Sequence, residues 1–169
     1  VTPKGVTLAD GRTLEADLVC LCIGTRANVE LVANTQVLEG ENVQIERGIV
    51  VDEGMRTNVP GIYAAGDCCE GVNLQTGKTA VIGLWANAAY QGQTAGHCMA
   101  VDPVIFSGNI LHNITHFMGM DFVGFGDVRT QGEVHRVGRP TDRRYIEAVV
   151  ADGELRCVNL LDSYHISGV

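Results

Sequence analysis

Basic residues are scarce in this sequence. Twelve Lys and Arg stand against twenty Asp and Glu, which gives a net charge of -8 at pH 7 over 169 residues. Because nucleic acids and anionic membranes are bound by basic faces, this balance argues against both as partners. Long apolar runs are missing too, and none approaches the length of a membrane span. No basic segment followed by an apolar one opens the chain, so no secretory signal is visible.

The six cysteines are spaced in a way that excludes common cysteine chemistry. No two of them have the C-x-x-C spacing of a redox dithiol or a zinc site. Cys20 and Cys22 lie two apart in an apolar run, so we expect both on one face of a strand as buried small hydrophobes. Cys68 and Cys69 are adjacent, which favours a structural role over a redox pair. Because a disulfide framework does not suit so apolar a chain, we predict a cytoplasmic protein.

Apolar runs and turn residues predict short strands in the first half of the chain. Residues 4–24, KGVTLADGRTLEADLVCLCIG, are predicted to form a β-hairpin, because Val6 and Leu8 alternate with polar residues, Asp10-Gly11 is a strong turn pair, and the chain then returns. Residues 17–23, DLVCLCI, form a continuous apolar run that is typical of a strand buried on both faces. We also expect two short strands around Gly48, a buried strand at residues 61–65, and a loop that turns at Thr76-Gly77.

A helix is predicted at about residues 84–99, because small residues recur there at spacings of three or four. The small residues are Ala86, Ala89, Gly92, Gly96 and Ala100. Each glycine costs about 1 kcal/mol against alanine inside a helix. We therefore expect this small-residue face to be buried against a closely approaching partner.

From about residue 102 onward the sequence pattern predicts mostly strands, and we place a domain boundary there. The segments predicted as strands are residues 110–118, 120–128 and 132–138, followed by a hairpin at 143–162 that turns at Asp152-Gly153.

Residues 57–70, TNVPGIYAAGDCCE, place a carboxylate directly after a short apolar run. In open α/β sheets, ligands lie beyond the carboxyl ends of strands. Asp67 is therefore well placed to accept hydrogen bonds from a sugar or ribityl hydroxyl, and the small residues before it let a ligand approach the backbone. The alternative is that Asp67 simply caps a helix or turn.

Three segments together resemble the pyridine nucleotide-disulfide oxidoreductase superfamily. Residues 57–68, TNVPGIYAAGDC, resemble its second FAD-binding motif, in which the aspartate binds the ribityl chain. Residues 16–28, ADLVCLCIGTRAN, resemble the strand and glycine at the exit of its NAD domain, with Ala27 where proline is usual. Residues 76–100 resemble the helix of its NADH oxidase, rubredoxin reductase and nitrite reductase branch, with Ala86 in place of a proline. The strand-rich end resembles the C-terminal domain of that branch.

The resemblance implies a set of flavin-binding residues. They are Gly24, Ala65, Gly66, Asp67, Leu84, Trp85 and Ala86. The aspartate and the glycine before it would contact the ribityl chain and phosphate. The start of the helix would face the flavin ring, where free amides and the positive end of the helix dipole would stabilise negative charge on the reduced flavin. Gly24 would lie near the nucleotide cleft. The resemblance implies no metal ligand.

The implied fold class is α/β, with a partial FAD/NAD(P)-binding Rossmann-like domain that is β-rich and has one long helix, and then a small strand-rich α+β domain. Residues 1–27 would end the NAD(P)-binding domain, 28–101 would form the second half of the FAD-binding domain, and 102–169 would form a truncated C-terminal domain. The superfamily needs two Gly-x-Gly-x-x-Gly phosphate loops, and GFGDVR at residues 124–129 is only a partial match. We therefore expect a fragment, the C-terminal part of a longer enzyme.

Our leading hypothesis is an enzyme fragment: the full-length protein would be a FAD-dependent NAD(P)H oxidoreductase that passes hydride from NAD(P)H to flavin and on to an acceptor. The fragment itself is expected to be inactive. The alternative is a non-catalytic module that keeps the fold for dimerisation or partner binding. The resemblance implies a homodimer formed through the C-terminal domain. The acceptor and the choice between NADH and NADPH are not encoded in these residues.

Two further groups of residues point to simpler roles. His112 and His116 are four apart, but no glutamate accompanies them in a stretch of β-branched and aromatic residues, so we expect ordinary surface or core histidines and no metal. A small basic patch is more consistent with a solvated loop than with an anion site. Its members are Arg136, Arg139, Arg143 and Arg144.

Overall fold

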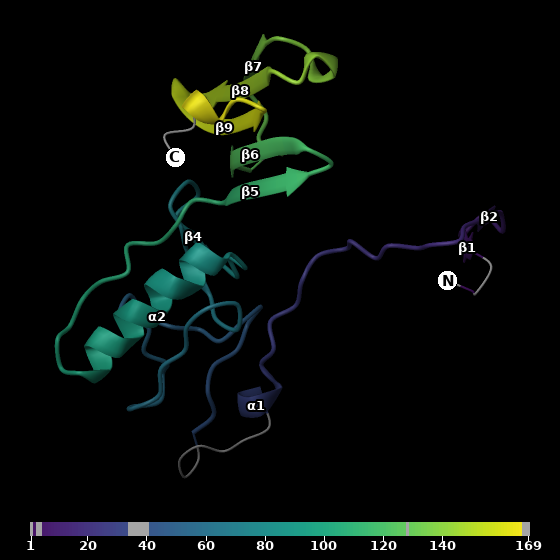
Figure 1. Cartoon of the computed structure of the whole chain (residues 1–169). Helices are drawn as coiled ribbons and strands as arrows, with labels where there is room; N and C mark the ends of the chain where they lie inside the picture. The colour runs from purple at the N-terminus through teal and green to yellow at the C-terminus, as the bar shows by residue number, and fades with distance from the viewer. Residues whose placement is uncertain (1, 3–4, 34–40, 128, 167–169) are drawn as a thin grey trace.

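The computed structural model describes residues 2, 5–33, 41–127 and 129–166 of the chain (Figure 1). An N-terminal arm with a small hairpin at its tip leads to a middle region built around one long helix, and a five-stranded sheet follows. The described chain is rich in strands and has one long helix, as expected for the β-rich partial Rossmann-like domain and the strand-rich domain that follows it. Among the described residues, no helix is long and apolar enough to cross a membrane.

The hairpin at the tip of the arm confirms the predicted turn, but its second strand ends at Glu15, well before the predicted limit near residue 24. Strands β1 (Gly5–Thr7) and β2 (Thr13–Glu15) pair antiparallel, with Gly5 opposite Glu15. The turn between them includes Asp10, whose carboxylate accepts the Arg12 backbone N–H at 3.1 Å. Gly11 has a φ of 87°, a conformation that favours glycine.

The predicted strand at residues 17–23 does not form, and this prediction was wrong. The segment runs as an exposed connection between the hairpin and the rest of the molecule (Figure 1). Leu18, Leu21 and Ile23 are 80%, 72% and 90% exposed, and Cys20 and Cys22 are exposed instead of buried. A strand buried on both faces needs neighbours, and no described segment lies beside this one to pair with it.

The middle region buries the expected apolar residues without forming the expected strands. Helix α1 (Glu30–Ala33) is followed by a core that contains Val43, Ile49, Val59, Ala64 and Cys69. The strands predicted around Gly48 and at residues 61–65 are reduced to isolated bridges. The reason is that the chain reverses within a few residues, with the Glu46 N–H donating to the Gly48 carbonyl, so no ladder can extend.

A short hairpin takes the place of the loop predicted at residues 70–82. Strands β3 (Gly71–Asn73) and β4 (Lys78–Ala80) pair antiparallel. The turn itself is where the sequence places it, since the Gly77 N–H donates to the Asn73 carbonyl at 2.8 Å. Short strands of this kind are missed because the segment has little apolar alternation.

Helix α2 (Trp85–Met99) confirms the predicted long helix. Its buried face, however, is not the predicted one. The buried residues are Asn87, Gln91, Thr94, Ala95 and Cys98, while most of the small-residue stripe is exposed. A Cβ added at Gly92 or Gly96 would meet no other atom within 4 Å. The polar side chains can be buried because they form hydrogen bonds there, which lowers the cost of burying them.

The C-terminal strands match the prediction closely. They are β5 (His112–Phe117), β6 (Met120–Gly126), β7 (Glu133–Val137), β8 (Tyr145–Ala151) and β9 (Glu154–Leu161). They form one antiparallel sheet in the order β5-β6-β9-β8-β7, with the last hairpin turning at Asp152-Gly153 as predicted. Short 3-10 helices, η1 (Pro140–Asp142) and η2 (Tyr164–Ile166), follow β7 and β9.

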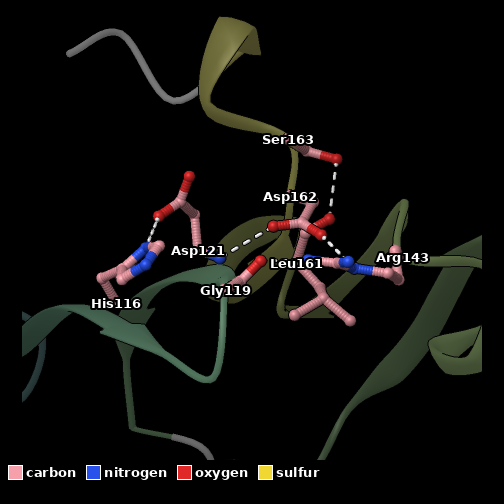
Figure 2. A network of polar contacts seen from close by, with 7 residues as sticks. All are labelled: His116, Gly119, Asp121, Arg143, Leu161, Asp162 and Ser163. Atoms are coloured by element: carbon pink, nitrogen blue, oxygen red, sulfur yellow. Dashed lines mark hydrogen bonds and ion pairs between the residues drawn. The ribbon is translucent and has the colours of Figure 1, made fainter.

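A polar network holds one corner of this sheet together (Figure 2). The Asp162 carboxylate accepts the Asp121 backbone N–H at 2.7 Å and the Arg143 Nε–H at 3.0 Å. The Arg143 guanidinium also donates to the Gly119 carbonyl. The Asp121 N–H, and then the nearby guanidinium, lower the pKa of Asp162. Elsewhere on the sheet, Arg136 pairs with Glu147 at 2.7 Å, so the predicted basic patch is partly neutralised.

The sheet is connected to the middle region through the β3–β4 turn. The Gln75 Nε2–H donates to the Arg156 carbonyl at 2.6 Å, and the Arg156 guanidinium donates to the Gln75 carbonyl at 3.3 Å. Asn109 adds backbone bonds to Val72 and Leu74. The domain boundary near residue 102 remains a prediction.

Candidate cofactor site

The predicted site is built around a tight turn that begins at Gly66. Gly66 is buried and has a φ of 85°, and its carbonyl accepts the Cys69 N–H at 3.1 Å. A Cβ at this position would lie 3.3 Å from the Ala88 Cβ on α2, so a side chain here would be both strained and crowded. Asp67 follows on the outside of the turn, where it is exposed. Ala65 is half-buried and packs on the core cluster that includes Met55.

Two buried side chains hold this turn from opposite directions. The Gln91 Oε1 on α2 accepts the Gly66 N–H at 2.8 Å and the Cys69 thiol at 3.5 Å. The Glu70 Oε1 accepts the N–H groups of Arg47 and Gly48 at 2.9 Å and 3.3 Å. The turn is thus tied to the long helix on one side and to the chain reversal at Gly48 on the other.

The second part of the site is the N-terminus of α2. Leu84 is extended at the cap position, with φ −131° and ψ 135°. Among the described residues no side chain caps this end, and the first turn contains no acidic residue. The first amides of the helix and the positive end of its dipole are therefore available to an electron-rich ligand. Asn87 holds the segment that leads into the helix, because its Nδ2–H donates to the Ile82 carbonyl at 3.0 Å.

Three separate segments converge beside Asp67. A Cβ built on Gly83 would lie 3.4 Å from the Asp67 Oδ2 and 3.8 Å from the Thr25 Oγ1. The structure therefore brings together Asp67, Thr25 and Gly83, which directly precedes Leu84 and helix α2. A Cβ built on Gly24 would meet no atom within 4 Å, so the roles predicted for Gly24, Trp85 and Ala86 remain predictions. Because glycine occupies position 83, the space next to the carboxylate stays open. No hydrogen bond or ion pair engages that carboxylate within the described part of the chain.

These groups suit a hydroxylated chain joined to an electron-rich ring. An exposed carboxylate accepts hydrogen bonds from hydroxyls, and an uncapped helix N-terminus donates amides to ring oxygen and nitrogen atoms. The ribityl chain and ring of FAD present both features, so the residues present fit the cofactor that the sequence motifs imply.

Cys69, the buried member of the adjacent cysteine pair, does not have the properties of a redox nucleophile. Burial, followed by the charges of Cys68, Glu70 and Asp67, raises the pKa of Cys69 to about 12. Because the thiolate is the reactive form, Cys69 is unreactive near neutral pH. Its thiol and that of Cys68 donate to the carbonyls of Gly66 and Ala65 at 3.5 Å and 3.3 Å, which supports the structural role expected from the sequence.

The paired histidines both contact other side chains of the sheet. His116 contacts Asp121, with Nδ1 and Oδ1 2.6 Å apart, and the His112 ring stacks on Phe125 with centroids 6.2 Å apart. In the described ranges, no group of three or more His, Cys, Asp or Glu side chains could hold a metal ion.

Sequence reasoning missed the residues that support the site. Gln91, Glu70 and Asn87 carry its buried hydrogen bonds, and Thr25 lines it. One signal was available: Asn87, Gln91 and Thr94 recur at spacings of four and three along α2, which marks a polar helix face. The small-residue pattern on the other face concealed it.

The chain is similar to a known protein family and to relatives within it. A model of the family described as "Pyridine nucleotide-disulphide oxidoreductase" matches residues 1–92. The NADH-dependent phenylglyoxylate dehydrogenase subunit epsilon of Aromatoleum evansii is 30% identical over 97% of this chain and 38% of its own length.

Solved structures show the same fold. A ferredoxin reductase for the CYP199A2 system from Rhodopseudomonas palustris superposes with a TM-score of 0.79 at 25% identity, over 96% of this chain and 39% of that one. A FAD-dependent pyridine nucleotide-disulphide oxidoreductase from Desulfovibrio vulgaris gives 0.70 at 28% identity, over 90% and 39%. The chain thus spans well under half the length of these relatives.

Proposed function

Because the chain belongs to the pyridine nucleotide-disulphide oxidoreductase family, we propose that it forms the C-terminal part of a longer FAD-dependent enzyme that oxidises NADH or NADPH. The observation that carries this proposal is the convergence of Asp67, Gly83 and Thr25 next to an uncapped helix N-terminus. Bound FAD would supply the hydride chemistry. The residues of this chain would bind and orient it.

Each part of the site has a defined task in this proposal. The Asp67 carboxylate accepts hydrogen bonds from ribityl hydroxyls, and Gly66 lets the chain of the cofactor pass close to the backbone. The first amides of α2, at Trp85 and Ala86, donate toward the ring, and the helix dipole favours negative charge there. Gly24 precedes Thr25, and we propose that it would lie on the side where the nicotinamide nucleotide enters.

The 169-residue chain by itself should be colourless and inactive. It contains no complete Gly-x-Gly-x-x-Gly loop, so the pyrophosphate groups of FAD and NAD(P)H lack their usual binding site. We propose that these loops are supplied by the rest of the longer protein. Losing several phosphate contacts should weaken FAD binding by roughly three decades or more.

We propose that the protein is cytoplasmic and that its partner is a second copy of the same chain, forming a homodimer. Support comes from β5, an edge strand of the five-stranded sheet. Ile114, Phe117 and Met118 are exposed on or next to it, which favours association of such edges. Light scattering of the longer protein should give twice the monomer mass, and a clean monomer at high concentration would contradict the dimer.

Substitution of Asp67 tests the cofactor proposal. In the longer protein, Asp67→Ala should weaken FAD binding by roughly 1.5–3 kcal/mol, because charge-assisted hydrogen bonds to hydroxyls are lost. FAD retention and flavin fluorescence titration measure this directly. Asp142→Ala is a matched control, because Asp142 lies exposed in η1 on the C-terminal sheet domain. Equal FAD affinity in both variants would contradict the role of Asp67.

A further inference from the structure

A completely buried glutamine lies on the inner face of α2. Gln91 is 0% exposed, with its amide beneath the turn that carries Asp67. Burying an amide costs free energy unless its polar atoms are hydrogen-bonded. Leucine or methionine would fill a similar volume without that cost. The amide therefore needs an explanation beyond packing.

Only the oxygen of the Gln91 side-chain amide is hydrogen-bonded in the described part of the chain. Its Oε1 accepts both the Gly66 N–H and the Cys69 thiol, which lie on either side of Asp67 in the sequence. Its Nε2 has no partner in the part of the chain that the structure describes. A Cβ at Gly71 would come within 2.7 Å of that nitrogen, so the amide group lies close to the backbone of β3.

We propose that Gln91 is a positioning residue for the flavin: its Oε1 fixes the backbone of Gly66 and thereby aims the Asp67 carboxylate at the ribityl chain. This inference rests on the proposed function. Gln91 is fully buried and would not touch the cofactor itself. It would act by holding the Gly66–Cys69 turn that carries Asp67. The unpaired Nε2 counts against a purely stabilising role, because an unsatisfied buried donor costs stability.

The orientation of the amide follows from its neighbours. The Gly66 N–H can only donate, so only an oxygen can receive it. Turning the amide over would place Nε2 against the Gly66 N–H and break the hydrogen bond from Gly66. The turn therefore depends on one acceptor atom, and a variant that keeps an acceptor there should keep the turn.

The test compares two substitutions in the longer flavoprotein. Gln91→Met keeps the length of the side chain and removes the acceptor. Gln91→Glu keeps an oxygen at the same place, and burial favours its neutral form, which still accepts through its carbonyl oxygen. Gln93→Met is the control, because Gln93 lies two residues away on the exposed side of the same helix. FAD affinity is measured by flavin fluorescence, and amide exchange at residues 64–70 is measured in the FAD-free protein.

We expect Gln91→Met to weaken FAD binding about tenfold or more and to speed exchange of the Gly66 amide. Gln91→Glu should stay within about threefold of wild type in FAD affinity, as should Gln93→Met. Unchanged affinity in Gln91→Met, or a failure of Gln91→Glu to restore it, would overturn the positioning role.

Two measurements on the wild type keep the test decisive. The Gly66 amide should exchange slowly without FAD, and fast exchange would overturn the role of Gln91 even if no variant folds. If the wild-type longer protein binds no FAD at all, the proposed function fails and the flavin role of Gln91 fails with it. If FAD binds normally and Gln91→Met binds equally well, only the inference about Gln91 fails.

Discussion

Residues 17–23 and strand β8 are both apolar runs in this sequence, yet they lie in opposite surroundings. β8 lies between β7 and β9, so its backbone groups are paired on both sides, and Val149 is buried. Residues 17–23 have no strand beside them in the described chain, and their large side chains face solvent. An apolar run supplies a preference for extended backbone, whereas a strand also needs partners for its N–H and C=O groups.

The arm and the sheet also differ in where their partners lie in sequence. Strands β5 to β9 form their ladders within residues 112–161, with neighbours joined mostly by short turns. The chain spans 38% of its Aromatoleum relative, so the longer protein proposed above would have room for partners of residues 17–23. The following predictions test this contrast.

Hydrogen exchange should show the largest difference. In the 169-residue chain, amides in residues 17–23 should exchange at nearly the rate of an unfolded peptide, while those of β8 and β9 should be slower by about a thousandfold. Mass spectrometry or NMR measures both in one sample. In the longer protein, residues 17–23 should become protected. Strong protection of this segment in the short chain would contradict its lack of partners.

The second largest difference should be in stability, when a large apolar side chain is shortened in the sheet and in the arm. Leu160 on β9 is buried and lies opposite Val123 on β6 and Ile146 on β8. Leu160→Ala should lower the free energy of unfolding by about 3 kcal/mol, because it removes packed methyl groups and leaves a cavity. Leu21→Ala in the arm should change it by less than about 0.5 kcal/mol. Denaturant unfolding of the 169-residue chain measures both, and equal losses would contradict the contrast.

Thiol labelling should show the same contrast with a smaller factor. Cys20 and Cys22 in the arm are exposed, whereas burial, followed by the charges of Glu147 and Asp127, raises the pKa of Cys157 in the sheet. We expect iodoacetamide at pH 8 to modify the arm thiols at least about tenfold faster. Peptide mapping over time measures the rates, and the single variants Cys20→Ser and Cys22→Ser assign them. Rapid modification of Cys157 would show that the sheet opens readily.

The smallest of these effects should be the loss of stability of the sheet at acidic pH. The pKa of Asp162 is lowered in the folded state, so its contribution to stability is present above the unfolded pKa and is lost as pH falls through the folded pKa. The loss should therefore begin below about pH 4. Asp162→Asn should flatten the pH dependence of unfolding there, whereas Asp17→Asn in the arm should not. An unchanged slope in Asp162→Asn would contradict the role of this carboxylate.

The same contrast explains what sequence analysis could reach. The strands and turns of residues 110–162 were predictable because each strand pairs within this region and the turn residues have distinct preferences. Helix α2 was predictable in its limits but not in its buried face. Its buried side chains Gln91 and Asn87 accept hydrogen bonds from Gly66 and Asn109, which lie 25 and 22 residues away in the sequence. Periodicity contains no information about those distant segments.

The candidate site divides in the same way. Gly66, Asp67 and Leu84 were predicted because they lie in local motifs, which the sequence displays directly. Glu70 and Gln91 were missed because their role depends on contacts across 22 and 25 residues with Gly48 and Gly66. Short motifs therefore identify the groups that face a ligand, while the groups that hold those motifs in place become visible only in three dimensions.

The position of Trp85 gives this protein a built-in optical probe. It is the single tryptophan of the chain, it is 89% exposed, and it is the first residue of α2 at the opening where the flavin ring is proposed to lie. Its emission in the 169-residue chain should therefore resemble that of indole in water. In the longer protein with FAD bound, transfer of excitation energy to the nearby ring should quench that emission. Cofactor loading could thus be followed in real time without any added label.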